Sequence, residues 1–309
     1  MVCKVEMMKV LVTGAKGFIG REVSMRLKLD HVVLEHVRSL SPGDKVSSNI
    51  IECDLEDENW LKHLTGVDAI IHLAAVAHNK STNPTLVERV NVDATLNLAN
   101  MAIEAGVKRF VFVSSIGVHG NNSVKPFNEN DIPCPHSEYA LSKLKAEKAL
   151  LDLTRAEDLE VVVVRPPLVY GKGAPGNFRK LMRLVHSLPV LPFGLCTNKR
   201  NVISVQNLAD FLVVCLEREE AANQIFCIAE DTSISIKDLT YSIAKGLGKR
   251  IYNIPIPKFL FLMGAALLGR SAEVQQLLWS LEVDSSKAHK LLGWKAPYSI
   301  DDSLSKLND

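Results

Sequence analysis

Residues 10–20 read VLVTGAKGFIG, and this stretch decides the fold. Its apolar start is typical of a strand, and a glycine-rich turn separates that strand from a predicted helix. Gly14 permits a tight turn, Gly17 lets backbone amides approach a pyrophosphate, and Gly20 lets the helix pack against the strand. The start of the helix offers unpaired N–H groups and the positive end of a dipole. We therefore predict a dinucleotide-binding turn, in which the further cofactor contacts beside the glycines are Lys16, Phe18 and Ile19.

Short apolar runs alternate with longer helical patterns across the first half of the chain. The apolar runs are Val10–Val12, Val32–Val37, Ile50–Cys53, Ala69–Leu73, Phe110–Ser114 and Val161–Arg165. The helical patterns include Ile19–Leu29, Leu86–Ala105 and Glu138–Asp152. This alternation predicts an α/β fold, a Rossmann-type doubly wound parallel sheet with helices on both faces. Such a sheet buries both faces of its strands, which explains why the last of these runs begins with four consecutive valines.

The sequence changes in character after Pro167, where glycine, proline and asparagine become frequent and the predicted elements become shorter. We expect an NAD(P)-binding Rossmann domain over residues 1–170 and a smaller C-terminal region, mainly residues 171–309, that binds the substrate. Within residues 201–229, the strand-like runs Asn201–Val205 and Gln224–Ile228 are candidates to return to the main sheet.

The composition argues against several classes of protein. The 309 residues are 47% hydrophobic and 23% charged, with a net charge of +1, which is ordinary for a globular protein and does not favour nucleic-acid binding. The six cysteines are scattered, without the spacing of a metal cage or a disulfide framework. We therefore expect no metal site, no signal peptide before the first strand, and a cytoplasmic protein with reduced thiols.

The most apolar segment of the chain covers residues 257–269. It is well short of the ~18 apolar residues that a membrane span requires, so we expect no membrane span. We expect a buried helix here, and a helix lying on a membrane surface is the alternative.

Tyr139 and Lys143 form a YxxxK pair on a predicted helix, where a spacing of four places both side chains on one face. Ser115 follows an upstream strand, at the edge where parallel sheets place their chemistry. A tyrosine has an ordinary pKa near ~10, and lowering it to the neutral range requires roughly 4 kcal/mol of phenolate stabilisation. One ammonium at ~4 Å in an effective dielectric of ~20 supplies about that much. We therefore expect Tyr139 to be a general acid–base, assisted by Lys143, with Ser115 holding the reacting oxygen.

Further motifs are spread along the chain. They are Cys53-Asp54-Leu55, His72-Leu73-Ala74-Ala75, Asn91-Val92-Asp93-Ala94-Thr95, the run RPPLVYG over residues 165–171, and Val283-Asp284-Ser285-Ser286-Lys287-Ala288 with Leu292-Gly293-Trp294. Together with the GxxGxxG spacing of the glycine turn and the YxxxK pair, they resemble the extended short-chain dehydrogenase/reductase family. Within it, the chain looks like the branch of UDP-glucose 4-epimerase and related nucleotide-sugar 4-ketoreductases. The resemblance covers almost the full chain.

This resemblance implies roles for particular residues. Asp54 and Leu55 correspond to the family's adenine contacts, and the segment of Leu73, Ala74 and Ala75 to the residues that line the cofactor after the fourth strand. Tyr139 and Lys143 contact the cofactor as well. The residues implied to bind a UDP-sugar substrate are Ser115, Asn177 and Arg200. Arg270 is a weaker candidate for the diphosphate, and a solvated position at a helix end is the alternative.

The activity implied is NAD(P)-dependent redox chemistry at C4 of a UDP-hexose, in surface polysaccharide biosynthesis. A 4-epimerase and a reductase of UDP-4-keto-6-deoxy-N-acetylhexosamines share this machinery, and the sequence leaves both open. The alternative is a non-catalytic NAD(P)-binding regulator on the same fold. Retention of Ser115, Tyr139 and Lys143 together favours the enzyme. Family members commonly dimerise through the helix before the fifth strand and the YxxxK helix, so we expect a homodimer. The apolar positions that serve either this interface or the core are Leu96, Leu98, Ala99, Leu144 and Leu150.

Two departures from the family pattern bear on the ligands. Leu168 stands where many epimerases have an asparagine that contacts the nucleotide. Val37 stands about where NAD-preferring relatives have an aspartate for the ribose hydroxyls, and it is followed by Arg38. Arg38 and Lys16 are suited to a 2′-phosphate, so we expect NADP(H) to be preferred, with NAD as the alternative.

Overall fold

The structure is a computed structural model that describes residues 6–40, 47–57, 59–76, 83–154, 157–267, 269 and 271–307. A seven-stranded sheet forms its centre, with the strand order β10-β6-β5-β4-β1-β2-β3 and every neighbouring pair parallel. The strands are β1 (Lys9–Thr13), β2 (Val32–Val37), β3 (Ile50–Glu52), β4 (Ala69–His72), β5 (Arg109–Val113), β6 (Glu160–Arg165) and β10 (Ile225–Cys227). The predicted doubly wound α/β fold is thereby confirmed. The chain order reverses between β1 and β4, which is the switch point where such sheets bind ligands.

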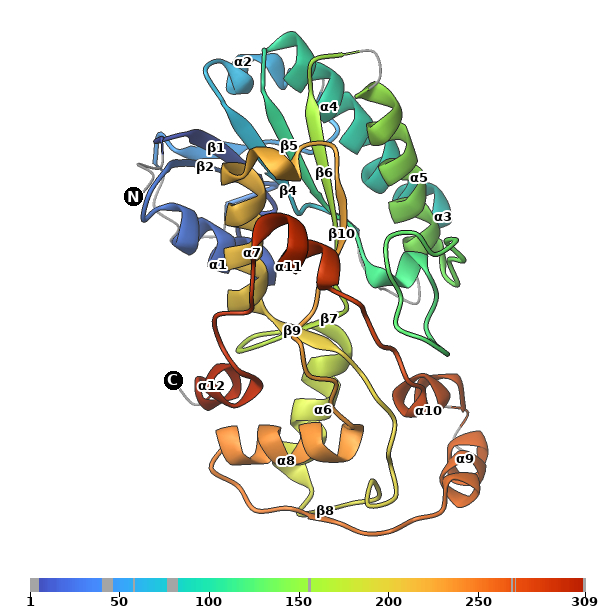
Figure 1. The fold of residues 1–309 in the computed structure, drawn as a ribbon. Helices are drawn as coiled ribbons and strands as arrows, with labels where there is room; N and C mark the ends of the chain where they lie inside the picture. Colours follow the sequence, from blue (N-terminus) through green and yellow to red (C-terminus); the bar gives the residue numbers. More distant parts are fainter. Residues whose placement is uncertain are drawn as a thin grey trace.

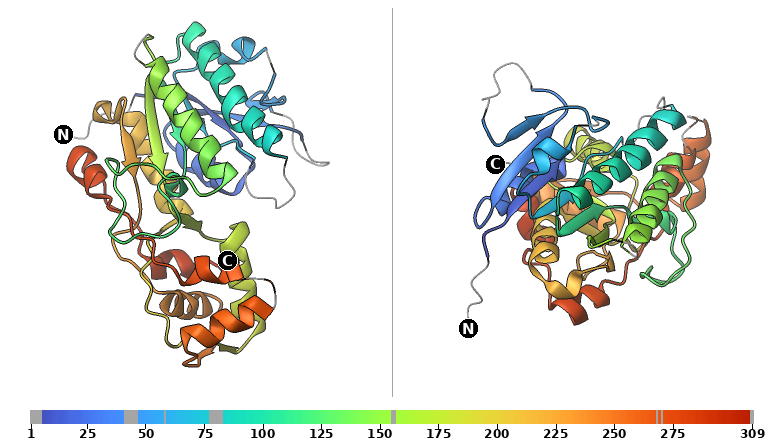
Figure 2. Two further views of the ribbon diagram at one scale, coloured as in Figure 1. Left: turned by 90° about the vertical axis from the view of Figure 1, so that its right-hand side faces the viewer. Right: turned by 90° about the horizontal axis from the view of Figure 1, so that it is seen from above.

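Helices cover both faces of this sheet (Figures 1 and 2). Alternate residues of β1 pack in opposite directions, because successive side chains of a strand point to opposite faces. Val10 and Val12 join one apolar core with α1 (Phe18–Leu27), α7 (Val205–Glu217) and α11 (Ser286–Leu292). Leu11 joins the other core with α2 (Leu61–Leu64), α4 (Ala94–Glu104) and α5 (Glu138–Leu153).

The helix predicted over Leu86–Ala105 is continuous but not uniform. It begins as α3 (Pro84–Glu88), passes through one π-helical segment, η1 (Arg89–Asp93), and continues as α4. Asn83 caps its N-terminus by accepting a hydrogen bond from the amide of Thr85. Single π-turns inside helices occur frequently at functional sites.

The C-terminal half forms a second, smaller body below the sheet in Figure 1. Its core lies among α6 (Gly176–Ser187), α8 (Ile236–Gly246) and α12 (Ile300–Ser305). Two short parallel pairs accompany these helices, namely β7 (Leu168–Tyr170) with β9 (Val202–Ser204) and β8 (Val190–Leu191) with β11 (Tyr252–Asn253). Of the two candidate returning segments, therefore, the one around β10 joins the main sheet, whereas the one around β9 pairs with β7 outside it.

Two helices, α9 (Lys258–Leu267) and α10 (Ser271–Leu278), lie at the far end of the second body (Figure 1). The expectation of a buried helix over residues 257–269 is wrong, because Phe259, Leu260 and Met263 are 62%, 47% and 58% exposed. One side of α9 does pack inward, where the ring of Phe261 meets the ring of Phe193 at 5.7 Å. Within the described ranges, no helix is long and apolar enough to cross a membrane.

Candidate active site

The glycine-rich turn lies between β1 and α1, at the switch point of the sheet. Gly14 has a φ of +68°, and a Cβ added to it would lie 3.1 Å from the amide nitrogen of Ala74. A Cβ added to Gly20 would lie 2.2 Å from the carbonyl oxygen of Gly14, so only glycine fits there. Gly17 closes the turn by donating its N–H to that same carbonyl at 2.9 Å. The predicted turn role of Gly14 and packing role of Gly20 agree with this geometry.

The start of α1 fits a negatively charged group. Gly17 is its N-cap, no side chain caps it, and its first turn holds no acidic residue. The N–H groups of a first helical turn lack partners within their own helix, and they attract anions. Lys16, Phe18 and Ile19 are half-buried around this turn. The turn therefore offers uncapped backbone donors with no acidic residue in the first helical turn, which suits a phosphate group.

A chain of hydrogen bonds fixes the carboxyl end of β4, the strand that pairs with β1. Thr13 Oγ1 accepts the amide protons of Leu73 and Ala74 at 3.1 and 3.2 Å, which leaves its hydroxyl proton for His72 Nδ1 at 2.9 Å. His72 Nε2 then donates to Thr95 Oγ1 at 3.0 Å. Burial holds the pKa of His72 well below 6.5, so the ring stays neutral. His72 is thus a buried structural residue that shapes the segment Leu73, Ala74 and Ala75, which is half-buried beside the glycine turn.

The predicted adenosine contacts lie at the next strand ends. Arg38 follows β2 and is exposed, and Asp54 follows β3 and is also exposed. Leu55 is buried, and its carbonyl accepts the indole N–H of Trp60 at 3.1 Å. These residues therefore line the same edge of the sheet as the glycine turn.

Ser115, Tyr139 and Lys143 lie at the carboxyl end of β5 and on α5. Lys143 is buried, donates to the carbonyl of Val113 at 2.9 Å, and has its Nζ 6.0 Å from the centre of the Tyr139 ring. Ser115 caps a short 3₁₀ turn, η2 (Ile116–Val118), by accepting the amide of Gly117 at 3.1 Å. A Cβ added to Gly117 would lie 3.2 Å from Ser115 Oγ and 3.7 Å from the Cβ of Ala140, so glycine lets Ser115 approach the first turn of α5.

The protein groups alone do not lower the pKa of Tyr139. Burial raises the pKa of Tyr139 to about 12, opposite in direction to the expectation from charge alone. Burial also lowers the pKa of Lys143 to about 7. The nearby carboxylate of Glu147 acts in the opposite direction and raises this pKa, but by less. Desolvation thus outweighs the attraction between ammonium and phenolate that the sequence suggested. The oxidised nicotinamide of NAD(P), when bound, supplies a hydride acceptor and a further positive charge.

The sequence did not reveal how the helix that carries Tyr139 and Lys143 is held in place. Asn91, in the π-helical segment, bonds both the N–H and the carbonyl of Val76 and donates to Ser142 Oγ at 3.0 Å. It therefore ties the loop after β4 to the helix that carries Tyr139 and Lys143. Its place in the motif of residues 91–95 was the only sequence signal, and that motif does not reveal its partners.

Besides Ser115, two of the predicted substrate residues, Asn177 and Arg200, lie in the second body. Asn177 is exposed in the first turn of α6. Arg200 is half-buried, and its Nη1 donates to the carbonyls of Gln276 and Trp279 at 2.8 and 2.9 Å, so it fastens the end of α10. Burial lowers the pKa of its guanidinium. Arg270 lies outside the described residues.

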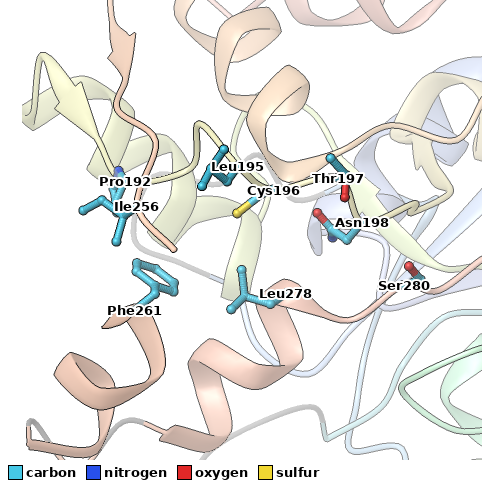
Figure 3. A pocket seen from close by; sticks show the side chains of 9 residues that line it. All are labelled: Pro192, Leu195, Cys196, Thr197, Asn198, Ile256, Phe261, Leu278 and Ser280. Atoms are coloured by element: carbon cyan, nitrogen blue, oxygen red, sulfur yellow. The ribbon is translucent and has the colours of Figure 1, made fainter. Parts of the chain in front are cut away.

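A cavity of about 260 Å³ lies beside the segment that leads to Arg200. Figure 3 shows its walls, which come from the strand-to-loop segment after β8 and from the two distal helices. Its polar side includes Asn198, whose amide donates to the carbonyls of Leu277 and Trp279 at 3.3 Å. The apolar side includes Leu195, Ile256 and Phe261.

The fold and this arrangement of side chains are those of a dinucleotide-dependent enzyme of the Rossmann class. Residues 10–229 match the NAD dependent epimerase/dehydratase family, and the chain belongs to that family. This confirms the resemblance to the extended short-chain dehydrogenase/reductases and the expected enzyme class.

Particular relatives extend over nearly the whole chain. The UDP-glucose 4-epimerase of Vibrio cholerae is 38% identical over 307 residues, covering 96% of this chain and 93% of the relative. A solved structure of UDP-glucose 4-epimerase with UDP-glucose, from Thermotoga maritima, is 26% identical with a TM-score of 0.75 and covers 97% of each chain. A UDP-N-acetylglucosamine 4-epimerase structure from Bacillus cereus has a TM-score of 0.81 at 21% identity, covers 97% of this chain and 98% of its own, and supports the fold alone.

Proposed function

We propose that this protein is an NAD(P)-dependent 4-epimerase of a UDP-hexose. The observation that carries the proposal is the group of Ser115, Tyr139 and Lys143 beside a glycine turn that fits a pyrophosphate. Relatives named as UDP-glucose 4-epimerases at 38% and 26% identity supply the substrate class. A role in surface polysaccharide biosynthesis and a cytoplasmic location belong to the same proposal.

In the proposed reaction, Tyr139 moves the proton of the C4 hydroxyl. Its phenolate oxygen takes that proton as the sugar is oxidised and later returns it to the C4 oxygen of the 4-keto intermediate, while the face of C4 that receives the returning hydride would set the new configuration. Ser115 donates a hydrogen bond to the reacting oxygen and holds it in line. Lys143, fixed by the carbonyl of Val113, stabilises the phenolate. Bound NAD(P) supplies the hydride acceptor and donor.

The finer ligand assignments also belong to this proposal. Arg38 and Lys16 select NADP(H) through a 2′-phosphate, with the exposed position of Arg38 after β2 as support. A structure of MoeE5 with UDP-glucuronic acid and NAD, at 26% identity, keeps NAD as the alternative. Arg200 and Asn177 contact the nucleotide diphosphate and nucleotide, and Arg270 is a further candidate.

A homodimer is part of the proposal as well. Leu98, Ala99 and Leu150 belong to the apolar core of the chain itself, and Leu144 is only 8% exposed. Leu96 is half-buried against that core. The interface would therefore depend on the outer face of α4 and α5, and sedimentation velocity at micromolar concentration tests it. A monomer there contradicts the dimer.

The deciding experiment replaces Tyr139 by phenylalanine, which removes the hydroxyl and keeps the ring. Turnover of UDP-glucose or UDP-galactose should fall about 10²- to 10⁴-fold, the usual contribution of a general acid–base. Tyr298→Phe, at an exposed tyrosine near the C-terminus, is the matched control and should keep full activity. Activity of Tyr139→Phe within a few-fold of the parent would favour the non-catalytic alternative. Stoichiometric consumption of NADPH with a UDP-4-keto sugar, without epimerisation, would instead assign a 4-ketoreductase.

A further inference from the structure

The far end of the second body presents an apolar surface that the proposed reaction does not use. We call it the distal tip and define it as residues 188–195 with β8, residues 252–257 with β11, and α9, at the bottom of Figure 1. On α9, Phe259, Leu260 and Met263 are largely exposed, with Phe259 at 62%. Large exposed apolar patches are unusual on soluble proteins and commonly mark interaction surfaces.

The exposed apolar residues of the distal tip come from several segments that contact one another. Tyr252 pairs with Val190 across β11 and β8, and the amide of Gly194 donates to the carbonyl of Ile254 at 3.0 Å. The segment after β8 reaches α9 where Phe193 meets Phe261. Besides the three on α9, the exposed apolar residues are Leu188, Val190, Leu195, Tyr252 and Ile254. The patch is therefore one surface of the fold and not a single frayed helix.

The segments that form and adjoin the distal tip carry basic residues but no acidic ones. The chain as a whole is nearly balanced, with 36 basic and 35 acidic residues, yet residues 188–200 and 239–272 contain no aspartate or glutamate. Lys199, Lys249 and Arg250 are exposed in those segments. Lys249 lies on the same body as β8, since its Nζ donates to the carbonyl of His186 at 2.6 Å. The distal tip thus combines apolar side chains with a positive rim.

We propose that the distal tip docks on the surface of an anionic phospholipid bilayer. Exposed aromatic and aliphatic side chains bury in the boundary between headgroups and acyl chains, and Lys and Arg beside them attract anionic headgroups. A second copy of the chain fits less well, because a twofold interface would bring the same positive rim against itself. This inference rests on the surface alone and does not depend on the proposed reaction.

Docking in this way places the cavity of Figure 3 near the bilayer. Leu195 lies on the distal tip and lines the cavity, and Phe261 lines it from the inner side of α9. The Rossmann sheet lies at the opposite end of the molecule, so the glycine turn stays in the aqueous phase (Figure 1).

The test is sedimentation of the 309-residue protein with phosphatidylcholine vesicles that contain or lack phosphatidylglycerol. We expect binding to the anionic vesicles, weakened about fivefold for each charge removed in Lys249→Gln and Arg250→Gln. The double change Phe259→Ser/Met263→Ser should weaken it by at least about tenfold. Val124→Ser/Ile132→Ser, at exposed apolar positions remote in sequence from the distal tip, is the matched control and should bind like the parent. Turnover of soluble substrate should be the same in all of these proteins.

Three results would overturn the proposal. The first is a parent protein that does not sediment with anionic vesicles. The second is a Phe259→Ser/Met263→Ser protein that binds them as the parent does. The third is a concentration-dependent dimer in sedimentation velocity that this double change abolishes, since the surface would then belong to a second copy.

Discussion

Arg165 and Glu147 form a buried ion pair directly behind the proposed acid–base group. Arg165 Nε lies 3.1 Å from Glu147 Oε1, and both side chains are almost fully inaccessible. Glu147 lies one helical turn beyond Lys143 on α5, whereas Arg165 ends β6. The remaining guanidinium nitrogen of Arg165 contacts His119 Nε2 at 2.8 Å. The pair therefore joins the helix that carries Lys143 to the carboxyl edge of the sheet.

Glu147→Gln should destabilise the fold strongly, because it leaves the Arg165 charge buried without a counterion. Removing one partner of a buried pair typically costs about 3–5 kcal/mol in the free energy of unfolding. Urea denaturation measures this loss. The control is Glu88→Gln, which breaks the exposed pair with Lys145 and should cost about 1 kcal/mol or less. Equal effects of the two changes would contradict the importance of the buried pair.

Acid should destabilise the protein in part through His119. Burial, followed by the charge of Arg165, lowers the pKa of His119 to about 4, from an ordinary value of 6.5. As pH falls from about 6.5 to about 4, the unfolded chain binds this proton and the folded protein does not, so the free energy of unfolding falls over that window. His119→Gln should reduce this slope, and the exposed His289→Gln should leave it unchanged. Urea denaturation at several pH values measures it, and an unaltered slope in His119→Gln would argue against the assignment.

Gly20→Ala should push α1 away from the glycine turn. The added Cβ would meet backbone atoms, with the carbonyl oxygen of Gly14 at 2.2 Å, so the helix must shift. Overpacking of this kind costs about 1–3 kcal/mol, and here it should also weaken NAD(P)H binding in fluorescence titration. Gly106→Ala is the matched control, because it has a φ of +75° with nothing within 4 Å of the added Cβ. Gly106→Ala should lower the free energy of unfolding and leave cofactor binding intact. If Gly20→Ala also lowers stability without weakening cofactor binding, the result would count against the turn as a phosphate site.

Sequence reasoning predicted the parts of this molecule that depend on local patterns. The apolar runs from Val10 to Arg165 became six of the seven strands of the main sheet, because parallel strands buried on both faces are apolar throughout. It failed where the outcome depends on distant partners. The pairing of Arg165 with Glu147 joins a strand to a helix, and no spacing rule indicates it. The apolar pattern of residues 257–269 likewise predicted the helix α9. It could not show which side of this helix other elements cover, so the exposure of Phe259 was not predicted.

The proposed NADP(H) preference is tested by Arg38→Ala. A charge-assisted hydrogen bond is worth about 1.5–3 kcal/mol, so the dissociation constant of NADPH should rise about tenfold or more while that of NADH hardly changes. Arg218→Ala, at an exposed arginine after α7, is the control for a general loss of positive charge. Equal weakening of NADPH and NADH by Arg38→Ala would remove the basis for the preference.

Arg200 has one observed role and one proposed role, and one substitution series can separate them. Its Nη1 fastens the end of α10 through the carbonyls of Gln276 and Trp279, and we propose that the same guanidinium attracts the diphosphate of the substrate. Arg200→Ala should therefore raise the KM for the nucleotide sugar about tenfold or more, since hydrogen bonds to charged groups are worth about 1.5–3 kcal/mol. NAD(P)H binding should not change, because the glycine turn lies on the other body.

Arg200→Lys keeps the charge but loses the forked donor geometry. It should recover part of the KM if the charge serves the diphosphate, and little of the stability if the fork fastens α10. Steady-state kinetics with the UDP-sugar and urea denaturation of the same proteins measure the two effects. A normal KM in Arg200→Ala, together with a lower free energy of unfolding, would leave Arg200 as a structural residue and place the diphosphate elsewhere.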